Sequence, residues 1–167
     1  MNKGASLMDQ ISSSRTCRKA KAYLIKARIP SEEEAKVTKQ RDGHVEGIRV
    51  IPKSPYNRWK RIRFIYHTYM KKLGIRTDLG YLVVENRLDE VLKLLRYVEA
   101  ELKAIEKELV NWINNEGKEY IKEFIAKYGH LPAWVKPASR FSYVIIPLEL
   151  CEEDYHRLIS QTITGES

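Results

Sequence analysis

The sequence lacks the motifs of the common cofactor-dependent and covalent enzyme classes. Its 8 glycines stand singly, and none belongs to a GxGxxG or GxxxxGK phosphate-binding loop. No serine or cysteine has the surroundings of a nucleophile elbow. The 4 histidines are scattered, and none stands four residues from another or beside a cysteine pair. We therefore predict a protein that is not an enzyme and that has no cofactor and no metal site.

Cysteine and long apolar runs are also scarce. The chain has 2 cysteines, Cys17 and Cys151, which exclude a disulfide framework or a four-cysteine zinc site within one chain. They lie near opposite ends and could pair, but two unpaired thiols are the preferred interpretation. No apolar run approaches the roughly 18 residues of a membrane helix, and residues 1–10 lack the apolar core of a signal peptide. We expect a soluble, cytoplasmic protein with no membrane partner.

Acidic residues are few in the first half of the chain. Residues 1–77 contain 19 Lys and Arg against 6 Asp and Glu, whereas residues 78–167 contain 11 against 16. The net charge of +8 is therefore the difference between a strongly basic half and an acidic half. This asymmetry favours an anionic partner for the N-terminal half.

Residues 54–74 carry the clearest local signal, an amphipathic helix. Ser54 suits an N-cap, Pro55 suits the first helical position, and Gly74 suits the left-handed residue that ends a helix. The segment contains no Asp or Glu. A period of 3.6 residues gathers an apolar stripe that we expect to face a core, namely Trp59, Ile62, Tyr66, Tyr69, Met70 and Leu73.

The opposite face of this helix is basic, with Lys60, Arg63, His67 and Lys71 in helical spacing. Such a face suits phosphates, and an aromatic side chain within it can stack on a base. Alternatively, acidic side chains elsewhere in the protein or its oligomer neutralise it. The first interpretation predicts a set of phosphate-contacting residues with Phe64 as a stacking or wedging group: Arg15, Arg18, Lys19, Lys21, Arg58, Lys60, Arg61, Arg63, Phe64, His67, Lys71 and Lys72.

Residues 88–128 show a second helical pattern. Apolar residues three and four apart predict a heptad seam with charged flanks, formed by Leu88, Val91, Leu95, Val98, Leu102, Ile105, Leu109 and Trp112. The spacing shifts near residues 114–117, so one helix or two remain possible. Because residues 55–73 cover only about half of this stripe, we predict a homo-oligomer formed through the 88–128 seam.

The remaining segments predict a small sheet. Residues 1–14 are read as a mobile arm, 20–29 as a strand, 31–39 as a short capped helix and 45–51 as a second strand. Residues 141–146 are apolar almost throughout, as in a strand covered on both faces, and 20–29 is the expected partner. The predicted fold is a single domain, α+β but mostly α. A helical hairpin or coiled coil over 55–129 is joined to a two- or three-stranded sheet of residues 20–51 and 141–150.

One weak catalytic pattern is present. Asp78 and Glu85 flank an apolar run, and two carboxylates at a strand end can hold Mg²⁺ for phosphodiester hydrolysis. Glu85, however, precedes Asn86 and Arg87, which are better explained as the start of the long helix.

Taken together, the 59–73 helix, the 80–84 link, the 88–109 seam and the closing strand Phe141-Ser142-Tyr143-Val144-Ile145 resemble an uncharacterised family of helical domains. The resemblance covers about residues 20–150, and the family occurs in phage-like and plasmid gene neighbourhoods of bacteria and archaea. It implies an archaeal or viral mobile-element context. Our hypothesis is a sequence-independent binder of the DNA or RNA backbone, and the alternative is a coiled-coil scaffold or adaptor that binds an acidic protein partner.

Overall fold

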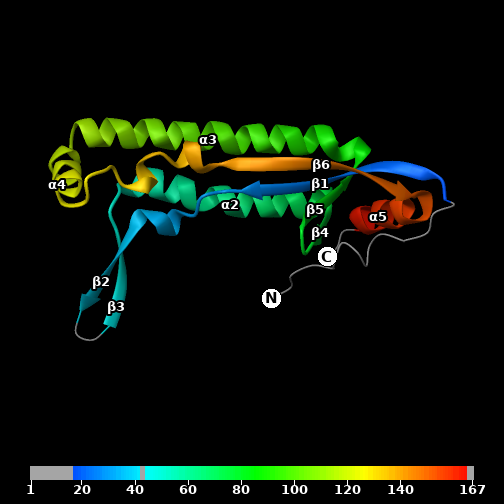
Figure 1. Ribbon diagram of the computed structural model, residues 1–167, viewed down its shortest axis with the longest axis horizontal. Helices are drawn as coiled ribbons and strands as arrows, with labels where there is room; N and C mark the ends of the chain where they lie inside the picture. Colours follow the sequence, from blue (N-terminus) through cyan, green and yellow to red (C-terminus); the bar gives the residue numbers. More distant parts are fainter. Residues whose placement is uncertain (1–16, 42–43, 165–167) are drawn as a thin grey trace. The chain divides into compact units, whose positions relative to one another are not determined.

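The computed structural model describes residues 17–41 and 44–164 of the chain. It is an α+β structure with a four-stranded antiparallel sheet, a separate two-stranded ribbon and several helices (Figure 1). The chain divides into two compact units. Unit 1 contains the residues up to Arg28, Ile65–Arg96 and the residues from Ser142, while unit 2 contains Ile29–Phe64 and Tyr97–Phe141.

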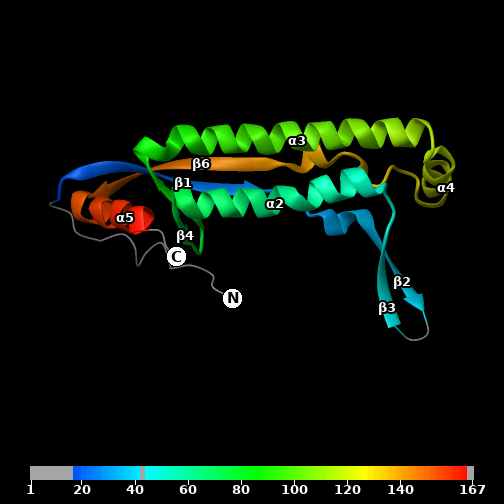
Figure 2. The same cartoon turned by 180° about the vertical axis from the view of Figure 1, so that it is seen from behind.

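The sheet of unit 1 has the strand order β4-β5-β1-β6, with neighbouring strands antiparallel. Its strands are β1 (Lys19–Arg28), β4 (Ile75–Thr77), β5 (Gly80–Val84) and β6 (Ser142–Cys151). Strands β1 and β6 pair along their whole length and lie side by side in both views (Figures 1 and 2). The predicted pairing of the N-terminal and C-terminal parts is confirmed, in a sheet of four strands rather than two or three.

The alternation of side chains along the strands gives this sheet two apolar faces. On one face, Leu24 and Leu82 belong to a buried cluster that Leu158 of α5 (Glu152–Thr164) joins. On the other face, the ring of Tyr66 stands edge-on to that of Tyr81, with 6.1 Å between ring centroids. Burial on both faces stabilises the central strands.

The turn between β4 and β5 depends on a glycine. Gly80 has a φ of +138°, and a Cβ added there would lie 2.5 Å from the carbonyl oxygen of Ile25. A side chain would meet both backbone strain and a clash with β1. Glycine at this position therefore lets β5 approach β1 closely.

The prediction that residues 141–146 are covered on both faces is wrong. Strand β6 lies at the end of the sheet, and Val144 and Ile146 are 54% and 40% exposed. An apolar run is typical of a central strand. Whether a strand lies at the centre or at the edge of a sheet, however, depends on which other strands pair with it, and the local sequence does not contain that information.

The segment between Pro30 and Pro52 also differs from the prediction. The expected helix over 31–39 is only the 3₁₀ turn η1 (Glu32–Ala35), capped by the Ser31 hydroxyl. The chain then forms the ribbon of β2 (Lys36–Arg41) and β3 (His44–Arg49), which is separate from the four-stranded sheet. The strand expected at 45–51 therefore exists, but its partner is β2.

Three helices correspond to the basic and heptad patterns: α2 (Lys53–Leu73), α3 (Leu88–Asn114) and α4 (Lys118–Tyr128). The two alternatives left open for 87–128, one helix or two, are resolved as two, because α3 ends at Asn114 and α4 begins at Lys118 with Gly117 as its N-cap residue. A Cβ on Gly117 would lie 2.6 Å from the Trp112 ring, so only glycine allows that ring to pack over the break. Helices α2 and α3 are joined by β4 and β5 rather than by a hairpin loop.

The heptad seam of α3 is already buried within one chain. Six of its eight apolar residues are at most 1% exposed, namely Val91, Leu95, Val98, Leu102, Ile105 and Leu109, while Leu88 and Trp112 are partly buried. Residues outside the helices contribute to the cover at the end of this seam, because the ring of Trp134, in the 3₁₀ turn η3 (Ala133–Val135), lies 6.3 Å from that of Trp112 between centroids. Self-association through 88–128 and a coiled-coil geometry both stay predictions.

Cys17 and Cys151 form a disulfide with a Cα–Cα distance of 5.3 Å, so the preferred interpretation of two unpaired thiols is wrong. The register of β1 and β6 explains the bond. Lys19 lies opposite Cys151, which brings the residues just before β1 to the end of β6. Spacing along the sequence gave no indication of this proximity.

No helix in the described part of the chain combines the length and the apolar character required to cross a bilayer.

Candidate nucleic-acid interface

The part of α2 that belongs to unit 2 has one buried face, which sets the direction of its exposed side chains. Trp59 is fully buried, and its indole Nε1 donates a hydrogen bond to the carbonyl oxygen of Pro30 at 2.8 Å. Ile62, three residues further on, is also buried. Because side chains three and four apart share a helix face, this anchoring turns Lys60, Arg61 and Phe64 toward solvent.

Arg58 does not belong to the free basic face. Its guanidinium forms ion pairs with Glu108 and, at 2.9 Å, with Glu101, both on α3. The hydrogen bond that Arg58 donates to Glu101 is the main cause of a raised pKa for Arg58, so the group stays charged and paired. The prediction that Arg58 contacts phosphate is therefore not supported, since its charge is compensated within unit 2.

Three other cations of this helix have no such compensation. Lys60, Arg61 and Arg63 are exposed, and within residues 17–41 and 44–164 none of them forms an ion pair with a carboxylate. Phe64 is 72% exposed, the highest value among the exposed large hydrophobic side chains of the described residues. It lies one turn beyond Lys60 and Arg61, so an aromatic ring stands among uncompensated positive charges.

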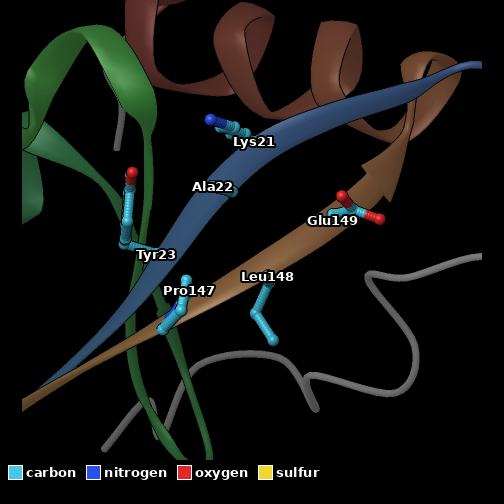
Figure 3. A pocket seen from close by; sticks show the side chains of 6 residues that line it. All are labelled: Lys21, Ala22, Tyr23, Pro147, Leu148 and Glu149. Carbon is cyan, nitrogen blue, oxygen red and sulfur yellow. The ribbon is translucent and has the colours of Figure 1, made fainter.

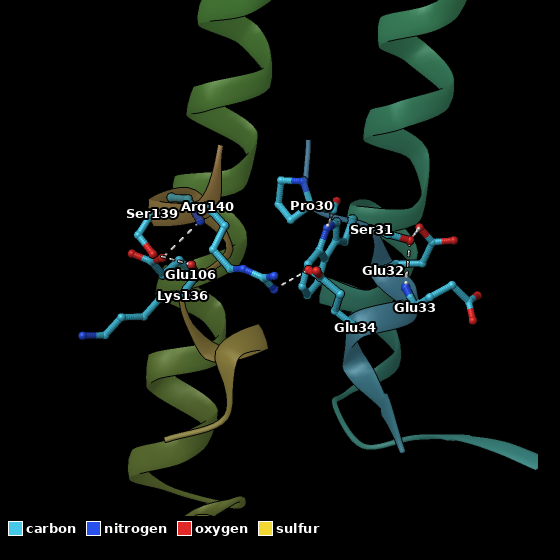
Figure 4. A network of polar contacts seen from close by, with 11 residues as sticks. Pro30, Ser31, Glu32, Glu33, Glu34, Glu106, Lys136, Ser139 and Arg140 are labelled. Atoms are coloured by element: carbon cyan, nitrogen blue, oxygen red, sulfur yellow. Dashed lines mark hydrogen bonds and ion pairs between the residues drawn. The ribbon is translucent and has the colours of Figure 1, made fainter. Parts of the chain in front are cut away.

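Further acids of unit 2 are engaged in the network shown in Figure 4. Glu34 forms an ion pair with Arg140, and Glu106 accepts a hydrogen bond from the backbone N–H of Ala138 at 3.2 Å. These contacts attach the 3₁₀ turns η1 and η4 (Pro137–Arg140) to their neighbours within the unit. Glu34 and Glu106 therefore have structural partners of their own.

The part of α2 that belongs to unit 1 contributes a second, smaller group. Lys71 and Lys72 are exposed, and Lys72 Nζ lies 5.6 Å from the centroid of the Tyr69 ring. Tyr69 is 53% exposed, so its predicted place in the buried stripe is wrong. His67 is engaged, because its Nδ1 lies 2.8 Å from the Tyr81 hydroxyl. The helical wheel assigned Tyr69 to the buried face and His67 to the free basic face. Both assignments fail because the two residues lie at the edges of the apolar stripe.

The predicted phosphate contacts before and within β1 do not form one group. Arg15 lies outside the described residues, and Arg18 forms a surface ion pair with Glu152 at 3.6 Å. Lys19 and Lys21 are exposed on β1. Lys21 stands opposite Glu149 on β6, and both line an open pocket of about 330 Å³ (Figure 3). A carboxylate beside Lys21 makes this a weaker anion site than the unit 2 part of α2.

The two carboxylates of the nuclease alternative are separated. Asp78 lies in the turn before β5, and Glu85 begins the 3₁₀ turn η2 (Glu85–Arg87) after it. Five strand residues stand between them, roughly 17 Å of extended chain. Because Mg²⁺ ligands stand about 2.1 Å from the ion, these carboxylates cannot share one ion within a chain.

Comparison with known proteins gives no match to a family model, to a curated protein or to a solved structure.

Proposed function

We propose that this protein binds the backbone of nucleic acids without sequence preference, through Lys60, Arg61 and Arg63, with Phe64 stacking on an exposed base. The observation that supports this proposal is the exposed face of α2 in unit 2, where three cations that have no acidic partner among the described residues surround a ring that is 72% exposed. The cations can bind phosphates, and the Phe64 ring can stack on any base because every base has a π-face.

The unpaired bases of a single strand would be the better ligand for Phe64. Stacking of a base on an aromatic side chain contributes about 1–3 kcal/mol, while a duplex keeps its bases stacked on each other. The cations act on either form, so duplex DNA should bind more weakly rather than not at all. A preference for single strands is the specific contribution that we assign to Phe64.

The test is a fluorescence anisotropy titration with labelled random single-stranded and duplex oligonucleotides. If three phosphates are contacted, raising the salt from about 50 to 200 mM should weaken binding roughly 20- to 40-fold. The triple variant Lys60/Arg61/Arg63→Glu should lose binding. Phe64→Ala should weaken single-strand binding about tenfold or more and leave duplex binding nearly unchanged.

A matched control separates this surface from the effect of net charge. Lys107, Lys118 and Lys122 are exposed on α3 and α4, and their replacement by Glu changes the net charge by the same amount. If the control variant loses binding as strongly as the α2 variant, the assigned surface is wrong. Absence of binding at low salt, together with binding of an acidic polypeptide such as polyglutamate, would instead favour the adaptor alternative.

A further inference from the structure

Two contacts show how the unit 2 parts of α2 and α3 lie against each other. The Ser54 hydroxyl donates a hydrogen bond to Glu108 at 3.4 Å, and Arg58, one turn further along α2, pairs with Glu101 at 2.9 Å. The contacting residue advances along α2 while its partner moves back along α3, so the two helices run in opposite directions. Because side chains three and four apart share a helix face, the stripe of α2 that faces α3 continues from Ser54 and Arg58 to Arg61.

The same rule places Tyr97 on the stripe of α3 that faces α2. Tyr97 lies four residues before Glu101, one turn closer to the start of α3. On α2, the next residue of the facing stripe after Arg58 is Arg61. Because the helices run in opposite directions, this step sets Arg61 and Tyr97 across from each other. Phe64 follows Arg61 by one further turn of α2.

The pair of Arg61 and Tyr97 differs from the two pairs before it, because it contains a cation and an aromatic ring but no carboxylate. Tyr97 is 42% exposed, and Arg61 is exposed as well. A phosphate held by Arg61 therefore has an exposed ring on each side: Phe64 on the same helix and Tyr97 on the neighbouring helix.

We propose that Tyr97 is a second stacking residue of this surface and that the bound strand crosses from α2 to α3 at Arg61, with one base on Phe64 and the next on Tyr97. This role presupposes the nucleic-acid binding proposed above and specifies its ligand. Packed helices lie about 8–10 Å apart, whereas stacked bases of one strand are about 3.4 Å apart. Rings on two helices therefore hold two bases that are unstacked from each other, which a single strand allows and a duplex does not.

The charges between the helices favour a strand that crosses over one that follows them. Glu101 and Glu108 together carry two negative charges, and Arg58 compensates one of them. A strand running between α2 and α3 toward Glu108 would bring its phosphates past this excess of negative charge. A strand that crosses at Arg61 passes the end of the facing stripes where no acid stands.

The test is fluorescence anisotropy of the full chain with labelled single strands. Tyr97→Ala should weaken binding of a random single strand about fivefold or more, and Tyr97→Phe should bind as the unchanged protein does, because it keeps the ring. A strand of the same length with abasic sugars in place of all nucleosides has the phosphates but no bases. The unchanged protein and Tyr97→Ala should bind this abasic strand equally well.

Tyr128 provides the matched control, because it is also an exposed tyrosine of unit 2 beside a cation. It is 53% exposed, and Lys127 Nζ lies 5.2 Å from the centroid of its ring. Tyr128→Ala should leave binding of the random strand unchanged. Equal losses from Tyr97→Ala and Tyr128→Ala, a loss of the same size from Tyr97→Phe, or an equal loss on the abasic strand overturns the stacking role of Tyr97.

A double variant tests whether the two rings hold separate bases. The losses of Phe64→Ala and Tyr97→Ala should then multiply in Phe64→Ala/Tyr97→Ala. A double variant that binds no more weakly than Phe64→Ala contradicts the crossing path.

The results also separate the role of Tyr97 from the proposed function. If the unchanged protein binds single strands and Tyr97→Ala binds them equally well, the role of Tyr97 is wrong and the proposed function stands. If the unchanged protein binds neither the random nor the abasic strand at low salt, both are wrong.

Discussion

The disulfide between Cys17 and Cys151 makes the strongest quantitative prediction for stability. It joins residues 134 positions apart and so closes a loop that contains most of the chain. In the chain-entropy model, a loop of that length restricts the unfolded ensemble by about 5 kcal/mol at 25 °C. Native disulfides commonly contribute roughly 2–5 kcal/mol, and the calculated figure lies at the upper end of that range.

The assay is urea denaturation followed by circular dichroism, with and without a reductant, on the same protein. We expect the free energy of unfolding to fall by about 3–5 kcal/mol on reduction, a large fraction of the roughly 5–15 kcal/mol of an ordinary domain. The double variant Cys17→Ala/Cys151→Ala should behave like the reduced protein, apart from the cost of removing a buried sulfur at Cys151.

A loss below about 1 kcal/mol on reduction would refute this reasoning. It would mean that the unfolded chain is already restrained, or that the bond does not form in the folded protein. Mass spectrometry of the alkylated protein separates these outcomes, because only free thiols gain mass.

Three further changes have defined outcomes. Tyr66→Phe should stabilise the protein by about 1 kcal/mol, because the buried Tyr66 hydroxyl has no hydrogen-bond partner within the described residues. Burial raises the pKa of Tyr66, so above about pH 10 the tyrosine ionises in the unfolded chain first and the stability of the folded protein falls. Tyr66→Phe should therefore flatten the alkaline fall in melting temperature. Arg58→Ala should cost about 1–2 kcal/mol, measured by urea denaturation, since it leaves the half-buried Glu101 and Glu108 without their cation. Gly80→Ala should cost about 2 kcal/mol or more in the same assay, because of its positive φ and the clash with Ile25.

The elements that depend on local patterns were predictable from the sequence. The apolar stripe of α2 is buried at Trp59, Ile62, Tyr66, Met70 and Leu73, as a period of 3.6 residues predicts. The shift in spacing near residues 114–117, which left one helix or two open, and the strand character of β1 and of the start of β6 are also local signals. The strands β2 and β4 were missed, because short polar segments become strands only through their partners.

The candidate site was only partly predictable, and Arg58 shows why. On a helical wheel Arg58 and Arg61 look equivalent, but the acids that pair with Arg58 come from positions 43 and 50 residues further along the chain. A wheel contains no information about such partners. Counting cations along α2 therefore overestimates the free positive charge, and only the tertiary structure separates Arg58 from Lys60, Arg61 and Arg63.

The disulfide also bears on where the protein functions. Disulfides persist in oxidising compartments and in the intracellular proteins of hyperthermophiles, and they are rare in the reducing cytosol of other organisms. The expected cytoplasmic location remains a prediction, which now requires either a thermophilic source or a bond that resists reduction. Titration of the bond with glutathione buffers tests the second condition. If the bond is already reduced at cytosolic potentials, the protein in an ordinary cytosol is the reduced form. Nucleic-acid binding there would then depend on the stability of the reduced protein, which the urea denaturation with reductant measures.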